Sequence, residues 1–135
     1  MSNGNVVTKP YMSGEPSEFS VRVLVVGDEC EALDYLGNIQ ESAARKFEAA
    51  FKNTCKGEVN EARFKFLTSD ACKGVFEFKV EDRGKVLRMY GFREGGSLVL
   101  THGSPKRKPK GVKSECRKVQ NFKKQLKMSR EARGI

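Results

Sequence analysis

Apolar residues recur along this chain with two spacings, one typical of strands and one typical of helices. Runs rich in β-branched and aromatic residues predict strands at 19–26, 75–80, 85–92 and 97–102. Turn-rich tetrapeptides separate the last three runs. We therefore expect these three strands to form antiparallel hairpins.

Two segments show the helical period. In residues 29–55 it is interrupted at Gly37 and Asn38, which predicts a short helix followed by a longer one. Residues 112–127 predict an amphipathic helix whose outer face is rich in Lys and Arg. The mixed segment 56–74 is expected to be a connector anchored to the core by its few apolar residues.

In chain order, these elements predict an α+β fold of the form β-α-α-β-β-β-α. We expect a small, curved, mostly antiparallel sheet of about four strands, with the helices covering one face. One domain should span residues 19–130, because a chain of 135 residues supplies a single modest core. Residues 1–18 are rich in Gly, Ser, Asn and Pro and predict a flexible extension.

The chain shows neither a membrane segment nor a recognisable metal motif. No run approaches the roughly 18 to 20 apolar residues of a membrane span, and the first residues lack the apolar run of a secretory signal. We therefore expect a cytoplasmic protein without membrane contact. Cys30, Cys55, Cys72 and Cys116 lack CxxC or Cys/His spacing. This predicts reduced, structural thiols, with no metal site and no cofactor.

Positive charge is concentrated at the C-terminal end. Residues 104–135 hold 12 Lys or Arg against two acidic residues, whereas the first 103 residues hold 14 basic and 15 acidic ones. A clustered basic surface indicates a polyanionic partner, because each cation placed on a phosphate releases condensed counterions. The alternative is a solvated helix face or tail without a ligand.

Arg88 and His102 are the first candidates for chemistry. Arg88 lies among apolar residues in mid-strand, so it either lines a groove or pairs with an acid such as Glu77. His102 is the only histidine and ends a predicted strand just before a basic segment. It is either a structural residue or a general acid or base at the mouth of a basic groove.

Residues 62–127 resemble the RelE/ParE toxin superfamily, in particular the phage-associated HigB-like branch of type II toxins. That branch shows a W-E-L-R-like strand, a strand ending in Y-R-V-x-Y-F, and a strand closing in L-L-H-G-F-x-K-K before a basic helix. Here the corresponding segments read VFEFKV, KVLRMYGF and LVLTHGSPKRK. The order and spacing of these segments carry the resemblance.

The resemblance implies a RelE-like fold and a metal-independent endoribonuclease that cleaves mRNA on the ribosome and so inhibits translation. The ribose 2′-OH would attack the adjacent phosphate and leave a 2′,3′-cyclic phosphate. The implied catalytic residues are Arg88 as phosphate stabiliser, Tyr90 as stacking or proton-donating group, His102 as general acid or base, and Lys79 in the W-E-L-R position. The predicted phosphate-binding cations are Lys106, Arg107, Lys108, Lys110 and Lys113.

A cognate antitoxin is the implied protein partner, and the choice between monomer and homodimer is left open. The sequence departs from the family pattern at three positions, with Phe76 for Trp, Lys79 for Arg and Ser104 for Phe. Lys79 keeps the charge but lacks the bidentate fork of Arg. Two other functions remain open, a ParE-like toxin that inhibits DNA gyrase and a non-catalytic nucleic-acid-binding module.

Overall fold

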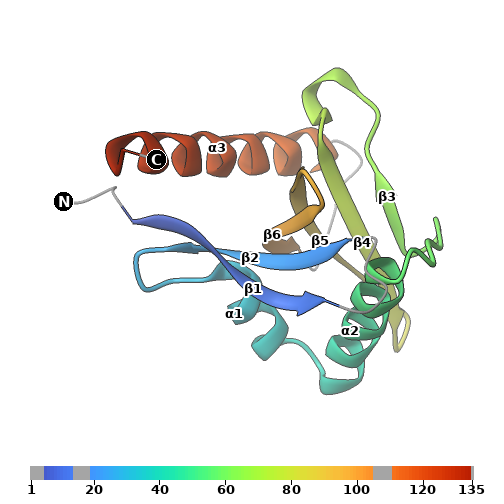
Figure 1. Ribbon diagram of the computed structural model, residues 1–135. Coiled ribbons are helices and arrows are strands. Elements are labelled where there is room, and N and C mark those ends of the chain that lie inside the picture. The colour runs from blue at the N-terminus through green and yellow to red at the C-terminus, as the bar shows by residue number, and fades with distance from the viewer. Residues whose placement is uncertain (1–4, 14–18, 105–110, 135) are drawn as a thin grey trace.

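The structure, a computed structural model, describes residues 5–13, 19–104 and 111–134 and confirms an α+β fold (Figure 1). The strands are β1 (Val6–Ser13), β2 (Ser20–Val26), β3 (Phe64–Phe66), β4 (Val75–Asp82), β5 (Lys85–Glu94) and β6 (Ser97–Ser104). The helices are α1 (Glu31–Asn38), α2 (Glu41–Cys55) and α3 (Gly111–Ala132), with a single 3-10 turn, η1, at Asp70–Cys72. Every predicted strand and helix is present within a few residues of its expected bounds.

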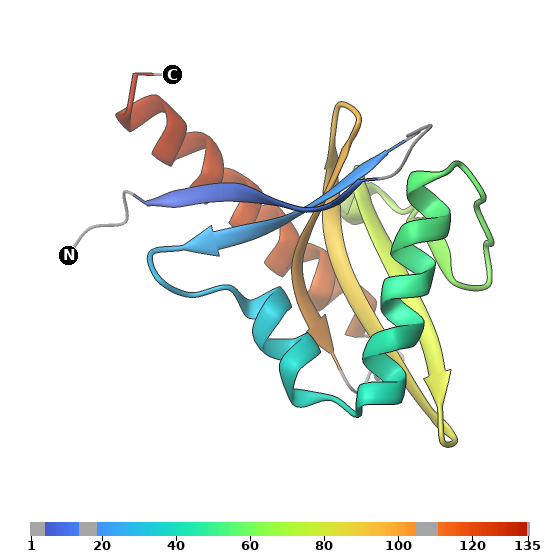
Figure 2. The ribbon, with the colours of Figure 1, turned by 60° about the horizontal axis from the view of Figure 1, so that its bottom comes forward.

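The sheet is larger and more mixed than predicted. Its six strands lie in the order β1-β2-β6-β5-β4-β3, and the β2–β6 pair is parallel while the others are antiparallel. The parallel pair arises because the segment between these strands crosses over the sheet through α1 and α2. The sheet twists strongly, so that β1 and β2 cross the direction of β4 and β5 (Figure 2).

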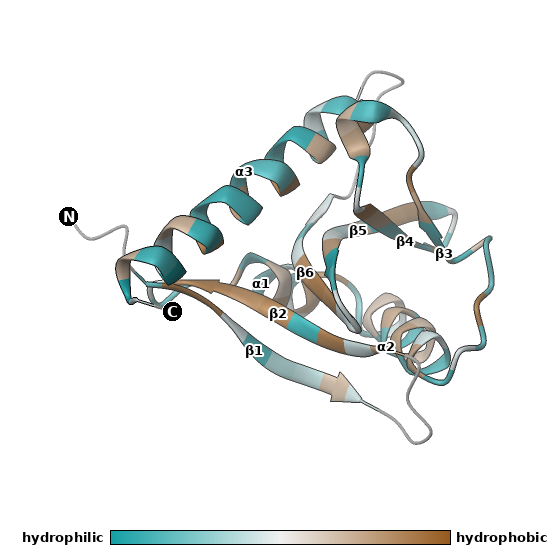
Figure 3. Cartoon of the chain, turned by 45° about the horizontal axis from the view of Figure 1, so that its top comes forward, coloured by the Kyte–Doolittle hydropathy of each residue, from teal (hydrophilic) through white to brown (hydrophobic). Residues whose placement is uncertain are grey.

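The prediction that the helices cover one face is wrong. One core contains Ala32 of α1 and Phe47 of α2, and a second core, on the opposite face, contains Val119 and Leu126 of α3. The central strands carry apolar side chains on both faces, so both faces need cover. The outer surface of α3 is mostly hydrophilic (Figure 3), as its amphipathic pattern predicts.

The prediction of a flexible extension over residues 1–18 is wrong for β1. This strand pairs with β2 along its length, and its first residue is held by α3. The Val6 N–H donates to Ser129 Oγ at 3.0 Å, and Arg133 Nη1 donates to the Val6 carbonyl at 3.2 Å. These partners lie more than 120 residues away in the chain, so local composition carried no sign of them.

The outer edge of β1 is largely closed to further pairing. The backbone groups of Val6 bond to Ser129 of α3 and to Arg133 directly after it, and the Thr8 carbonyl accepts a hydrogen bond from Arg22 Nη2 at 3.0 Å. Pro10 has no N–H to donate. An edge protected in this way does not offer the ladder that a second chain would need.

A β-bulge lies where β5 meets β6. Tyr90 opposes His102 and Gly91 opposes Leu100, so Thr101 is the extra residue. A bulge reverses which face the following side chains occupy. As a result His102 lies on the α3 side of the sheet.

Gly103 lies close beneath the ring of Tyr35 on α1. A Cβ on Gly103 would lie 2.2 Å from that ring, which itself packs edge-on against Phe47. Gly103→Ala should therefore lower the free energy of unfolding by about 1–3 kcal/mol through overpacking. Urea denaturation measures this change, with Gly96→Ala as the control because a Cβ there meets nothing within 4 Å. Equal stability of the two variants would contradict the packing argument.

Cys72 and Cys116 form a disulfide, which contradicts the prediction of four reduced thiols. Cys30 and Cys55 are free, as predicted. The pair meets because α3 packs over η1 and brings the two Cα atoms to 5.1 Å. A separation of 44 residues gave no sequence signal of this contact. Within the described residues, no helix is long and apolar enough to cross a membrane.

Candidate functional site

Strand pairing brings the predicted catalytic residues into two adjacent rows across β4, β5 and β6. The inner row consists of Glu77, Tyr90 and His102. The outer row consists of Lys79, Arg88 and Ser104. Members of the two rows are two residues apart on each strand, so they share one face and lie about 7 Å apart along it.

The inner row is buried beneath α3. Glu77, Tyr90 and His102 are at most 2% exposed, and the rings of Tyr90 and His102 stack with centroids 5.4 Å apart. The ring centroid of Phe122 in α3 lies 6.3 Å from the centroid of the His102 imidazole. Tyr90 therefore has no open ring face for a nucleobase in this conformation.

Both imidazole nitrogens of His102 have partners. Nδ1 lies 2.9 Å from Thr101 Oγ1, and Nε2 lies 2.8 Å from Glu115 Oε1. Burial lowers the pKa of His102 from its ordinary value, and the hydrogen bond to Glu115 acts in the opposite direction. Because a carboxylate can only accept, Nε2 is the donor to Glu115 Oε1.

Sequence reasoning missed Glu115, although a signal existed. It is the only acidic residue between positions 104 and 130, a stretch otherwise rich in cations. Its side chain is 17% exposed, so it connects the buried His102 with the surface. A carboxylate with this exposure and a histidine behind it can accept a proton from a bound molecule.

Glu115→Gln should lower the pKa of His102 further, because it removes the partner that favours the charged ring. An NMR pH titration of the imidazole measures the shift. Since the folded-state pKa already lies below the ordinary 6.5, stability is full above that pH and falls as the pH decreases toward the folded value. In the variant this decline should extend to lower pH. A raised His102 pKa would contradict the assignment.

The outer row is more open. Arg88 is 15% exposed by side chain, and Lys79 and Ser104 are half-buried. Arg88 Nε lies 3.4 Å from Glu77 Oε2, although the geometry is not that of a hydrogen bond. The predicted alternative, pairing of Arg88 with Glu77, is thus confirmed. Because Glu77 approaches at Nε, the remaining guanidinium donors are those on the terminal nitrogens.

The predicted phosphate-binding set is described only in part. Lys106, Arg107, Lys108 and Lys110 lie outside the described residues. Lys113 is exposed on the first turn of α3, two residues before Glu115. Further along the same helix, exposed cations include Arg117, Lys118, Lys124 and Lys127.

The arrangement can bind an anion and move a proton. The outer row offers a guanidinium, an ammonium and a hydroxyl on one face of the sheet, and Glu115 supplies a carboxylate backed by His102. Among residues 5–13, 19–104 and 111–134, no three His, Cys, Asp or Glu side chains come together in a way that could hold a metal ion. No protein-family model, curated protein or solved structure matches the chain.

Proposed function

We propose that this protein is an endoribonuclease toxin of the RelE type that cleaves mRNA on the ribosome in the cytoplasm. The observation that supports the proposal most is the outer row, where strand pairing brings Lys79, Arg88 and Ser104 together on one face. A strand-fixed Arg beside a Lys is suited to hold a phosphodiester. The basic helix that follows adds affinity for the rest of the RNA.

In the proposed reaction, the ribose 2′-OH attacks the adjacent phosphorus and the bond to the 5′ oxygen breaks. The products are a 2′,3′-cyclic phosphate and a 5′-OH end. Arg88 stabilises the charge that develops on the phosphoryl oxygens, and Lys79 protonates the departing 5′ oxygen. Glu115 accepts the proton of the attacking 2′-OH.

In this proposal His102 and Tyr90 act from beneath the substrate. His102 orients the Glu115 carboxylate through Nε2, and Thr101 fixes the imidazole from the other side. Tyr90 stacks on His102 and limits its rotation. Both are therefore positioning residues here, whereas Arg88, Lys79 and Glu115 contact the RNA.

The test combines purified chain with end-labelled mRNA in the presence and absence of ribosomes. We expect new 5′-OH ends and cyclic phosphates without added metal, and growth arrest when the gene is induced alone. Co-expression of the neighbouring open reading frame should restore growth, since an acidic antitoxin segment would neutralise the positive charge of residues 104–135, the basic region. Intact RNA together with harmless expression would overturn the proposal, and inhibition of DNA gyrase would replace it with a ParE-like activity.

A non-catalytic RNA-binding protein is the second candidate. The burial of Tyr90 and His102 favours it, because neither side chain reaches the surface in this conformation. RNA binding without turnover, unchanged by Glu115→Gln, would support this candidate instead. Turnover that Glu115→Gln abolishes, with affinity retained, would exclude it.

Neutralising Lys106, Arg107 and Lys108 together should weaken RNA binding more than catalysis. The slope of log affinity against log salt should fall by roughly 0.7 to 0.9 for every phosphate that these side chains no longer bind. Fluorescence anisotropy over a salt series measures the slope. The matched control is neutralisation of Lys9, Lys52 and Lys85, which lie outside the basic region. An unchanged slope in the first variant would show that this cluster is a solvated surface.

A further inference from the structure

We propose that Cys72 and Cys116 form a reversible thiol–disulfide site whose redox state sets the position of the first turns of α3. Its reactants would be low-molecular-weight thiols and disulfides, such as the two forms of glutathione. The proposal does not depend on RNA cleavage. It follows from where the disulfide lies, which other thiols the chain keeps, and which contacts hold α3.

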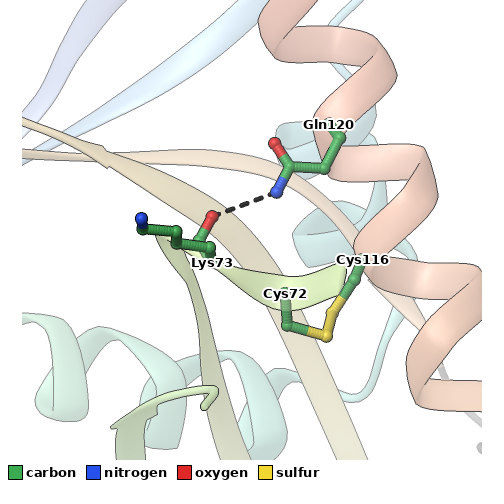
Figure 4. Close-up of a disulfide and its surroundings, with 4 residues drawn as sticks. All are labelled: Cys72, Lys73, Cys116 and Gln120. Atoms are coloured by element: carbon green, nitrogen blue, oxygen red, sulfur yellow. Dashed lines mark hydrogen bonds between the residues drawn. A yellow bond between two sulfur atoms is a disulfide. The ribbon is translucent and has the colours of Figure 1, made fainter. Parts of the chain in front are cut away.

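The disulfide lies under a short exposed turn. The disulfide joins the turn at Cys72 to α3 at Cys116 (Figure 4). Cys72 and Cys116 are 1% and 0% exposed, yet the neighbours of Cys72 in the chain, residues 68–71 and 73–74, are all exposed. A reagent therefore needs only a local opening of this turn.

The remaining thiols indicate reversibility. Cys30 is half-exposed and free, and Cys55 is buried and free. Both free thiols belong to the core on the opposite face from the disulfide. In the reducing cytoplasm proposed above, thiols stay free and the disulfides that do form are usually transient and redox-active. Burial raises the pKa of both Cys30 and Cys55. They therefore compete weakly for exchange at neutral pH.

The disulfide is covalently linked to the candidate site. Cys116 directly follows Glu115, which binds His102. The loop that the disulfide closes, residues 72–116, contains all members of the inner and outer rows. A change at Cys116 is therefore transmitted first to the Glu115 carboxylate.

The two halves of α3 are held differently. Near its start, the disulfide and the buried Val119 anchor the helix. The other contacts there are the Glu115–His102 bond, a bond of 3.0 Å from Gln120 Nε2 to the Lys73 carbonyl, and an exposed ion pair of Lys118. Exposed ion pairs contribute little. The second half is held by the buried Leu126 and by two hydrogen bonds from Arg130 to Glu94. Reduction should thus loosen the first half and leave the second in place.

The redox step is a two-electron exchange. One molecule of glutathione disulfide oxidises the two thiols through a mixed disulfide and is released as two molecules of glutathione. The reverse reaction consumes two molecules of glutathione and restores both protein thiols. No other oxidant or reductant is required.

The experiment equilibrates the full chain in glutathione buffers from oxidising to reducing and counts free thiols by alkylation and mass spectrometry. Hydrogen exchange is then measured on the oxidised and reduced forms. Amides 113–118 should exchange at least roughly tenfold faster after reduction, while amides 124–130 stay unchanged. The imidazole NMR signals of His102 should shift in parallel. Cys72→Ser/Cys116→Ser should behave as the reduced form in every buffer, and Cys30→Ser should behave as the wild type.

Two results would overturn the proposal. A pair that stays oxidised in excess reduced glutathione is a permanent cross-link, and a pair that is reduced without any change at 113–118 is not coupled to the site. The wild-type titration decides both points even if the double variant fails to fold. Absence of RNA cleavage in both redox states would contradict the proposed ribonuclease and would leave these readouts unaffected.

Discussion

Arg88→Ala should reduce RNA cleavage by about 30- to 1,000-fold while leaving RNA affinity almost unchanged. This range corresponds to about 2–4 kcal/mol of transition-state stabilisation, the effect of removing one preorganised donor from an active site. In the proposed function, the effect falls on turnover because the outer row holds Arg88 on a paired strand, whereas the lysines of residues 104–135 would supply most of the affinity. Single-turnover cleavage and anisotropy on the same RNA measure the two quantities.

Two further variants separate catalysis from folding. Arg88→Ala removes the ion-pair partner of the buried Glu77, and this change can destabilise the sheet. Glu77→Gln/Arg88→Ala removes the buried charge as well, so it should recover stability but not cleavage. Arg88→Lys keeps the positive charge but loses the two parallel hydrogen bonds that a guanidinium can donate, so its cleavage rate should lie between those of the wild type and Arg88→Ala. Full cleavage by Arg88→Ala would exclude Arg88 from the site.

Reduction of the Cys72–Cys116 disulfide should lower the free energy of unfolding by about 4 kcal/mol. The value follows from the loop-closure entropy of two cysteines separated by 44 residues. A typical domain is stable by roughly 5–15 kcal/mol, so this decrease is a large fraction of the total. Urea denaturation with and without a phosphine reductant measures it.

Cys30→Ser provides the control for this stability measurement, because Cys30 is a free thiol. Its unfolding free energy should respond to reductant as that of the wild type does. Cys72→Ser/Cys116→Ser should show no response to reductant at all. Equal midpoints for oxidised and reduced wild type would show that packing of Val119 and Leu126 alone holds α3 in place.

Local periodicity was sufficient to predict most of the fold. Alternation along residues 75–80 predicts that Phe76 and Phe78 share one face and Glu77 and Lys79 the other, and the structure agrees. A break between two helices is present as predicted, but it lies at Ile39 and Gln40, because Gly37 and Asn38 form the last two residues of α1. These features depend on neighbours within a few residues, which a single sequence contains.

The errors concern contacts between distant segments. β1 is held by Ser129 and Arg133, and the disulfide depends on α3 packing over η1. The bulge at Thr101 places His102 under α3, where Glu115 binds it, and no composition rule predicts a bulge. Strand pairing brings Lys79, Arg88, Tyr90 and His102 onto one face of the sheet, whereas the burial of His102 and its contact with Glu115 required the structure.

The protected edge of β1 has a consequence for biosynthesis. Val6 is translated before the other strands of the sheet, whereas Ser129 and Arg133, which bond to it, are translated after every strand. Until α3 has emerged from the ribosome, the nascent chain presents an uncapped strand edge, a form prone to intermolecular pairing. A chaperone that shields this edge would raise the yield of folded protein.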